Sequence, residues 1–149
     1  MKSKLVNAAG PQRTFVVVLD EGDEAVAALA RFAKEQRLDA AQITAIGAFS
    51  GAVLGYFDWE KKDYKRISVP EQVEVVSLVG DVALDPKGEP ALHAHAVLGR
   101  SDGAALGGHL LEGRVRPTLE VVINESPAHL RKRKDAATGL ALIDLDRTS

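Results

Sequence analysis

Three of the four histidines in the chain lie within one short stretch, ALHAHAVLGRSDGAALGGHLLEG, residues 91–113. His93 and His95 are two residues apart, and His109 follows behind a turn-like Ser101-Asp102-Gly103. Imidazole is a common ligand for divalent metals, and the chain has no cysteine that would supply thiolate ligands instead. The stretch is therefore a candidate metal site, provided that the fold brings the three rings together.

The loop between the two histidine-bearing segments decides whether the rings meet. His93 and His95 share one face of a predicted strand, because side chains two apart on a strand point the same way. A two-residue loop would send His109 to the opposite face, whereas a three-residue loop at residues 101–103 would place it directly opposite His95. Such a loop favours glycine at its last position, where Gly103 stands. The glycine favours the three-residue loop, although a glycine pair further on offers a second bulge.

In the three-residue register, the histidines are close enough to bind one ion. Cross-strand neighbours have Cβ atoms about 5 Å apart, and a Zn–N bond is about 2.0–2.1 Å long. Three protein ligands leave one coordination position for water or a small ligand, and zinc is the expected metal. Three acidic residues nearby in sequence are candidates to support the ligands or to act as a base: Glu112, Asp102 and Glu120. In the other register, the histidines are solvated or structural side chains.

The elements that would position these side chains are one helix and many strands. Residues 13–20 predict a buried first strand, and residues 20–39 carry a helical period with Gly22-Asp23 as candidate capping residues. From residue 41 onward, strand-length apolar stretches alternate with turn residues, and residues 127–134 are a candidate helical turn. Short connections favour antiparallel hairpins over parallel crossovers. The predicted fold class is α+β: a mainly antiparallel β-sheet packed by one main α-helix near the N-terminus.

The composition is that of an ordinary soluble globular domain. The chain has 149 residues, of which 46% are hydrophobic and 27% are charged, and this length buries a core without cross-links. We expect a single domain over residues 1–149, because there is no internal repeat or long linker. No segment approaches the about 20 apolar residues of a membrane helix, and the apolar run at residues 16–19 is too short for a signal sequence. A cytoplasmic protein is the expectation.

The charge distribution argues against a DNA-binding surface. The net charge is −2, whereas proteins that bind duplex DNA usually carry a basic excess that neutralises phosphates. The one dense basic run is HLRKRK, residues 129–134. Its candidate nucleic-acid contacts are Arg131, Lys132, Arg133 and Lys134. Acidic neighbours at 125 and 135 favour a solvated loop instead, and His129 is assigned to this loop rather than to the metal site.

Four segments in order, GAFSGAVLGYFD, VEVVSLVGDVAL, LHAHAVLGRSDGAALGGHLLEG and LEVVI, resemble the plant and prokaryote conserved (PPC) domain. The resemblance covers about residues 13–145. It implies an α+β fold with an antiparallel sheet, homotrimers, and a metal site at the three histidines. It also implies an association with DNA, because plant members carry an AT-hook before the domain. The Arg-Gly-Arg-Pro core of an AT-hook is absent from this chain, whose nearest run is GRVRP at residues 113–117.

Three functions follow from these observations. The preferred one is a trimeric, stand-alone PPC-domain protein that binds a divalent metal, with an open position for water or a small-molecule ligand and no membrane association. Whether it catalyses a reaction is left open. The alternative is a DNA-binding or transcription-associated module. The second alternative is an assembly module in which the metal only stabilises the trimer.

Overall fold

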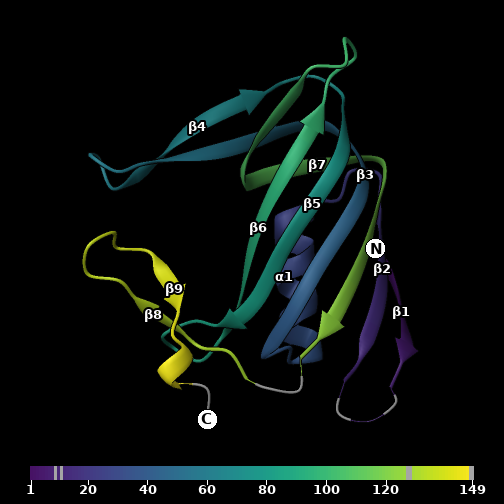
Figure 1. The fold of residues 1–149 in the computed structure, drawn as a ribbon. Helices are drawn as coiled ribbons and strands as arrows, with labels where there is room; N and C mark the ends of the chain where they lie inside the picture. Colours follow the sequence, from purple (N-terminus) through teal and green to yellow (C-terminus); the bar gives the residue numbers. More distant parts are fainter. Residues whose placement is uncertain (9, 11, 127–128, 148–149) are drawn as a thin grey trace.

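The computed structural model describes residues 1–8, 10, 12–126 and 129–147. Its elements in chain order are β1 (Lys2–Asn7), β2 (Thr14–Asp20), α1 (Ala25–Gln36), β3 (Ala40–Asp58), β4 (Asp63–Val69), β5 (Val73–Leu84), β6 (Pro90–Gly99), β7 (Ala105–Glu125), β8 (Lys132–Lys134), β9 (Ala141–Ile143) and the 3-10 helix η1 (Leu145–Arg147). The predicted α+β class is confirmed, with a mainly antiparallel sheet and an α-helix near the N-terminus (Figure 1).

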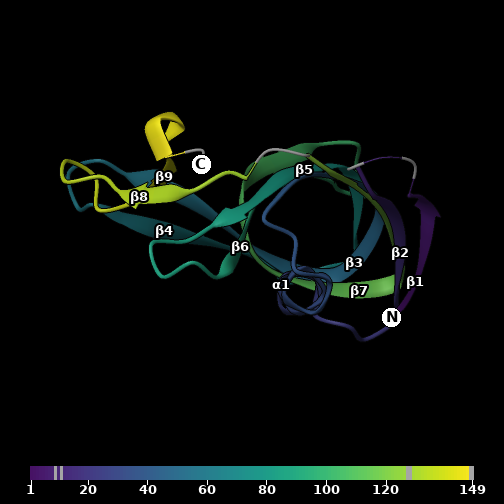
Figure 2. The same ribbon diagram turned by 90° about the horizontal axis from the view of Figure 1, so that it is seen from below.

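Four of the strands close into a ring. β3 pairs with β5 along one edge and with β7 along the other, β5 pairs with β6, and β6 pairs back to the first residues of β7. β2 and β1 extend the sheet from the second half of β7, and β4 extends it from the end of β3. β3 and β7 take part in both the ring and its extensions because they are 19 and 21 residues long. The curvature of the sheet and the position of α1 against β6 and β7 are seen in Figure 2.

The core lies between the inner face of these strands and one stripe of α1. The buried residues of the helix recur at helical spacing: Ala25, Ala28, Leu29, Phe32 and Ala33. Phe32 meets Phe15 of β2 edge to face, with ring centroids 5.4 Å apart. On β6, the inward-facing residues Ala94 and Ala96 are small and buried. The other face of β6 carries His93 and His95, so the core fixes the direction in which the histidines point.

The start of α1 is fixed by Glu24 rather than by Gly22-Asp23. The carboxylate of Glu24 accepts hydrogen bonds from Val26 N at 3.2 Å and Ala27 N at 2.7 Å, as expected of an N-cap. It also accepts one from Gly113 N at 2.9 Å, which ties the helix to β7. The two residues expected to cap form the preceding turn instead: Gly22 has a φ of +88°, and the Asp23 carboxylate accepts from Asp20 N at 3.0 Å.

Two further elements differ from the expectation. β1 was not predicted; it consists of exposed residues and pairs only with β2 among the described residues. The helical turn predicted at residues 127–134 is wrong where the structure describes it, because Lys132–Lys134 form β8, paired with β9. Residues 127–128 lie outside the described part of the chain. The backbone is held extended by partner segments, since Leu84 N donates to Leu130 O at 2.8 Å and Asp144 N donates to Arg131 O at 2.8 Å.

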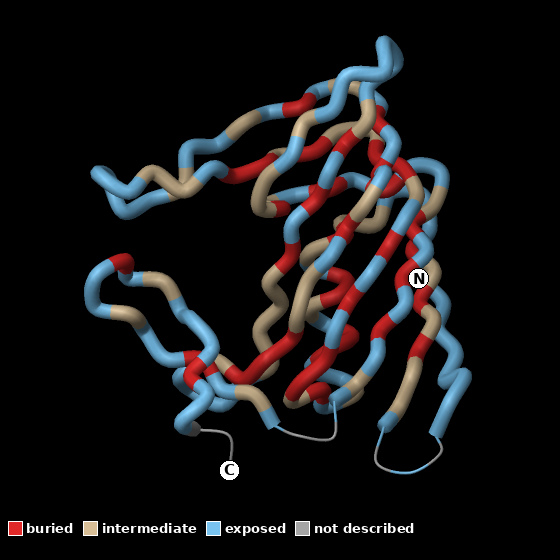
Figure 3. The backbone as a smooth tube through the Cα atoms, in the orientation of Figure 1, coloured by how far each residue is buried: buried red, intermediate tan, exposed pale blue. Residues whose placement is uncertain are grey.

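Two hairpins lie on the same side of the ring. Figures 1 and 2 both place the β3–β4 hairpin and the β8–β9 hairpin beside the outer face of β6. Buried and exposed residues alternate along the ring strands, whereas most of the β8–β9 hairpin is exposed (Figure 3). Of the helices in the described ranges, none is long and apolar enough to cross a membrane.

Candidate metal centre

The loop between β6 and β7 sets the register of the two strands. Arg100 N donates to Ala104 O at 2.8 Å, and Gly103 N donates to Arg100 O at 2.9 Å. Gly103 has a φ of +82°, a conformation that glycine adopts without steric cost. His95 is consequently paired with His109. The register predicted from a three-residue loop is confirmed.

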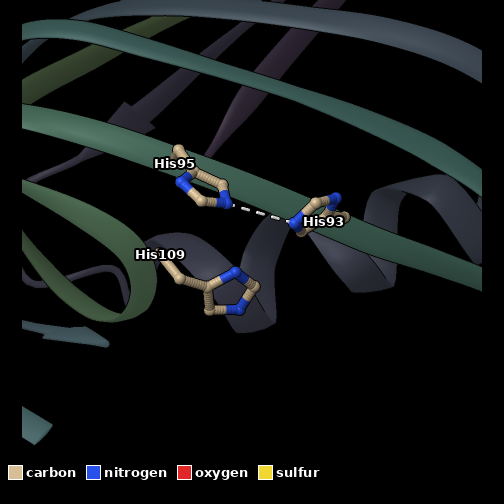
Figure 4. Close-up of side chains that lie close together, drawn as sticks. All are labelled: His93, His95 and His109. Carbon is tan, nitrogen blue, oxygen red and sulfur yellow. Dashed lines mark hydrogen bonds between the residues drawn. The ribbon is translucent and has the colours of Figure 1, made fainter. Parts of the chain in front are cut away.

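The three imidazoles form one cluster (Figure 4). Their ring centroids lie 5.1 to 5.3 Å apart, and Nε2 of His93 lies 3.2 Å from Nε2 of His95. Nδ1 of His109, the ring nitrogen bonded to Cγ, is turned toward these two rings (Figure 4). One nitrogen from each ring lies within 4.8 Å of the others. Three Zn–N bonds in tetrahedral geometry require nitrogens roughly 3.3 Å apart, so small side-chain rotations suffice.

His109 has the most unusual environment of the three. Its Nδ1 is buried and has no hydrogen-bond partner among the described residues. Burial, together with the nearby His93, His95 and Lys132, lowers the pKa of His109 from 6.5 to about 4. Burial and the neighbouring His93 also lower the pKa of His95. Both rings are therefore neutral at pH 7 and keep a lone pair for a metal ion, and a buried nitrogen without a partner is costly unless an ion binds it.

Asp81 of β5 orients His93 from behind. Its Oδ2 lies 3.2 Å from Nδ1 of His93, and its Oδ1 lies 3.0 Å from Nζ of Lys132. Burial alone would raise the pKa of Asp81, but the hydrogen bonds from His93 and Lys132 outweigh it and hold the pKa below its usual value. The carboxylate fixes the proton of His93 on Nδ1 and leaves the Nε2 lone pair facing the other two rings. A carboxylate behind a histidine is a common arrangement at metal sites.

Tyr64 of β4 covers the other side of the cluster. Its ring stacks on His109 with centroids 4.7 Å apart and an interplanar angle of 26°. Gly55, which is paired with His109, leaves room for this stack, because a Cβ there would lie 2.8 Å from the Tyr64 ring. Burial raises the pKa of Tyr64, so it stays a neutral phenol. Neither Asp81 nor Tyr64 was predicted from the sequence.

The three acidic residues predicted near the site lie elsewhere. Glu112 forms an ion pair with Arg66 of β4. Asp102 lies in the loop, where its carboxylate accepts a hydrogen bond from Ala104 N at 2.9 Å. Glu120 is exposed on the second half of β7, beside Ile46 of β3. None of the three contacts a histidine of the cluster within the described residues, and Asp81 occupies the supporting position.

The basic run disperses instead of forming one surface. Lys132 is only 6% exposed and pairs with Asp81, while Nε of Arg133 lies 3.3 Å from Oδ2 of Asp144. His129 pairs with Asp39 at 3.0 Å and does not belong to the histidine cluster. The side chains of residues 131 and 134 are exposed. Within the described part of the chain, only these two of the four candidate nucleic-acid contacts are both exposed and outside an ion pair.

Comparison with known families finds the Plants and Prokaryotes Conserved (PCC) domain, which matches residues 6–127. This range contains the ring strands, α1 and all three histidines of the cluster. No curated protein matches the chain.

Several solved structures share both sequence and fold with the chain. A plant- and prokaryote-conserved (PPC) protein from Pyrococcus horikoshii is 36% identical, with a TM-score of 0.82 over 89% of this chain and 91% of that one. A metal-containing protein from Archaeoglobus fulgidus is 34% identical, with a TM-score of 0.81 over 96% of each chain. A "putative dna binding protein" from Bacteroides thetaiotaomicron is 28% identical, with a TM-score of 0.88 over 97% of this chain and 99% of that one.

Proposed function

The chain belongs to the Plants and Prokaryotes Conserved (PCC, or PPC) domain family, and we propose that it binds a divalent metal ion, zinc, through His93, His95 and His109. The observation that carries the proposal is the convergence of three ring nitrogens within 4.8 Å of one another, one of them buried without a partner in the described residues. The similar protein from Archaeoglobus fulgidus, described as metal-containing, supports it.

The residues around the cluster have separate roles in this proposal. Asp81 holds the ring of His93 and fixes its tautomer, and Lys132 compensates the charge of Asp81. Tyr64 limits the rotation of His109 by stacking on it. An ion held by three neutral imidazoles supplies Lewis acidity toward water or a small ligand at its remaining coordination position.

A homotrimer is also part of the proposal. Exposed apolar side chains lie side by side on the outer face of β3, β5 and β7: Ile46, Val76, Val79 and Val122, with exposed fractions of 38% to 63%. Contiguous exposed apolar patches commonly mark protein interfaces. The three nitrogens come from one chain, which favours a ligand site over an ion that bridges subunits.

Elemental analysis of untagged protein tests the metal proposal. After reconstitution with zinc and desalting, we expect about one ion per chain in the wild type and none in His95→Ala. His129→Ala is the matched control, because His129 lies outside the cluster and should leave the metal content unchanged. Wild-type protein without metal, or His95→Ala with full occupancy, would refute the proposal. The mass in solution, measured on the same samples, tests the trimer.

DNA binding is the second candidate, and the description of the similar Bacteroides protein favours it. It predicts duplex affinity that falls steeply with salt and weakens in Arg131→Ala and Lys134→Ala, the variants of the two exposed side chains that form no ion pair within the described residues. Affinity that is equal in wild type and both variants, or insensitive to salt, would reject this surface.

A further inference from the structure

A cavity of about 510 Å³ opens directly beside the histidine cluster. His93, His109 and Tyr64 line it together with residues of the C-terminal β8–β9 hairpin. The volume falls in the usual range of small-molecule sites, about 300–1,000 Å³. The cavity therefore places any small ligand within reach of the proposed metal.

Most of the cavity lining is apolar, although it is open to solvent. Six aliphatic residues line it: Ala91, Leu92, Leu140, Ala141, Leu142 and Ile143. Leu142 and Ile143 of β9 are 47% and 41% exposed. Solvent-exposed aliphatic side chains beside the histidine cluster are favourable contacts for the apolar part of a ligand.

The charges in the cavity favour an anion. Among the described residues, Lys132 and Asp81 are the only charged side chains that line it, and they pair with each other at 3.0 Å. Their charges cancel, and the three histidines are neutral ligands when they bind metal. A bound divalent ion would thus leave two uncompensated positive charges beside an apolar wall. Carboxylate oxygen is among the ligands that zinc accepts.

We infer that the cavity binds a small organic acid, whose carboxylate lies at the metal and whose aliphatic chain lies against Leu142 and Ile143 of β9. This inference rests on the proposed metal site. It assigns a purpose to the β8–β9 hairpin, which carries both the apolar wall and Lys132, the residue that neutralises Asp81 and leaves the charge of the ion uncompensated.

Calorimetric titration of zinc-loaded protein tests the inference, with the zinc content of each sample verified first. The probes are acetate, butanoate and hexanoate, with hexanamide as the neutral analogue. We expect the dissociation constant to fall by up to about fourfold per added methylene, the value for full burial. Hexanamide should bind at least about tenfold more weakly than hexanoate, and metal-free protein should bind hexanoate at least about tenfold more weakly than the zinc form.

Variants of the hairpin test the apolar wall. Leu142→Ala should weaken hexanoate binding several-fold and leave acetate binding and zinc content unchanged. Leu145→Ala is the matched control, since Leu145 is 73% exposed and lies outside the cavity lining. A series without dependence on chain length, an unaffected Leu142→Ala, or equal binding of hexanamide would overturn the inference. Zinc-loaded protein that binds no acid would overturn it while the metal proposal stands, whereas protein that binds no zinc would refute both.

Discussion

One cavity is lined by His93 and His109 of the histidine cluster and by Lys132 of the basic run, but the side chains of the cluster and of the run are arranged in opposite ways. In the cluster, three rings from β6 and β7 converge with centroids 5.1 to 5.3 Å apart. In the run, Lys132 turns inward to Asp81, whereas Arg133 and His129 pair with two other carboxylates. Like charges next to each other in sequence separate, but the imidazole rings on paired strands remain together.

The difference follows from what holds each segment. β6 is paired with β5 along its length and with β7 over residues 95–99, so two strand registers fix the position of His95 and one fixes that of His93. β8 pairs through three residues with β9 alone among the described strands, and its side chains follow their individual ion pairs. The histidines therefore converge where the ring closes, and the hairpin contributes one charge and an apolar surface beside them.

Removal of a histidine should break the cluster with the largest effect. A zinc site with four ligands is worth roughly 10–16 kcal/mol, so the loss of one ligand corresponds to a quarter of this, about 2.5–4 kcal/mol. We expect His109→Ala to lower zinc affinity about 100- to 1,000-fold, measured by competition with a chromophoric chelator. Zinc at 1,000 times the wild-type Kd should stabilise the wild type by about 4 kcal/mol in denaturant unfolding, but the variant, whose Kd is higher, by only about 0.4–1.4 kcal/mol. Equal stabilisation of both proteins would contradict the assignment of His109.

Removal of the Asp81 carboxylate should have the second-largest effect on zinc affinity. Asp81→Asn keeps the shape of the side chain but no longer favours the Nδ1 proton of His93, and changes of this kind cost about 10- to 100-fold in metal affinity. The variant also leaves Lys132, which is 6% exposed, without its ion pair, which lowers stability. The double variant Asp81→Asn, Lys132→Met should regain stability but not metal affinity. If the double variant regained both, Asp81 would act only through the charge of Lys132.

Gly80, a glycine in a crowded position, tests whether the close pairing of β5 with β6 keeps Asp81 beside His93. A Cβ at Gly80 would lie 2.3 Å from the backbone oxygen of His93 and 3.0 Å from Ala94 Cα, so Gly80→Ala must push β5 and β6 apart. We expect a loss of about 1–3 kcal/mol in the free energy of unfolding, with weaker zinc binding as Asp81 moves from His93. Gly107→Ala is the matched control, because its Cβ would meet its nearest atom at 3.6 Å. Comparable losses in both variants would mean that crowding between β5 and β6 is not the cause.

Local signals in the sequence were sufficient for the helix and for the β6–β7 loop. The helical period and the turn glycine act over a few residues, and Gly103 suits the three-residue loop that places His109 opposite His95. Asp81 was missed because its position beside His93 depends on a second register, that of β5 against β6. The five-residue loop after Leu84 pairs Leu84 with Pro90 and thereby Asp81 with His93, a count that the run DPKGEP permits but does not demand.

Non-local contacts account for the rest. Tyr64 reaches His109 because β3 pairs with β4 and with β7 at once, and nothing in the order of the sequence specifies that closure. The extended conformation of β8 depends on backbone hydrogen bonds to Leu84 and Asp144, which override the local helical signals of a lysine- and arginine-rich stretch. In the basic run, the orientations of Lys132 and Arg133 depend on the positions of their partners in the fold, Asp81 and Asp144.

The smallest effect is expected from the fourth histidine, and it sharpens the contrast most. His129 pairs with Asp39 at 3.0 Å, and both side chains are more than one-third exposed, 59% and 38%, so the pair contributes about 0–1 kcal/mol to stability. His129→Ala should shift the unfolding midpoint slightly and leave zinc affinity within twofold of the wild type by the same chelator competition. A tenfold loss of zinc affinity would mean that the hairpin segment transmits its ion pairs to the cluster. The two regions would then be coupled, with Lys132 and Asp81 linking the hairpin segment to His93.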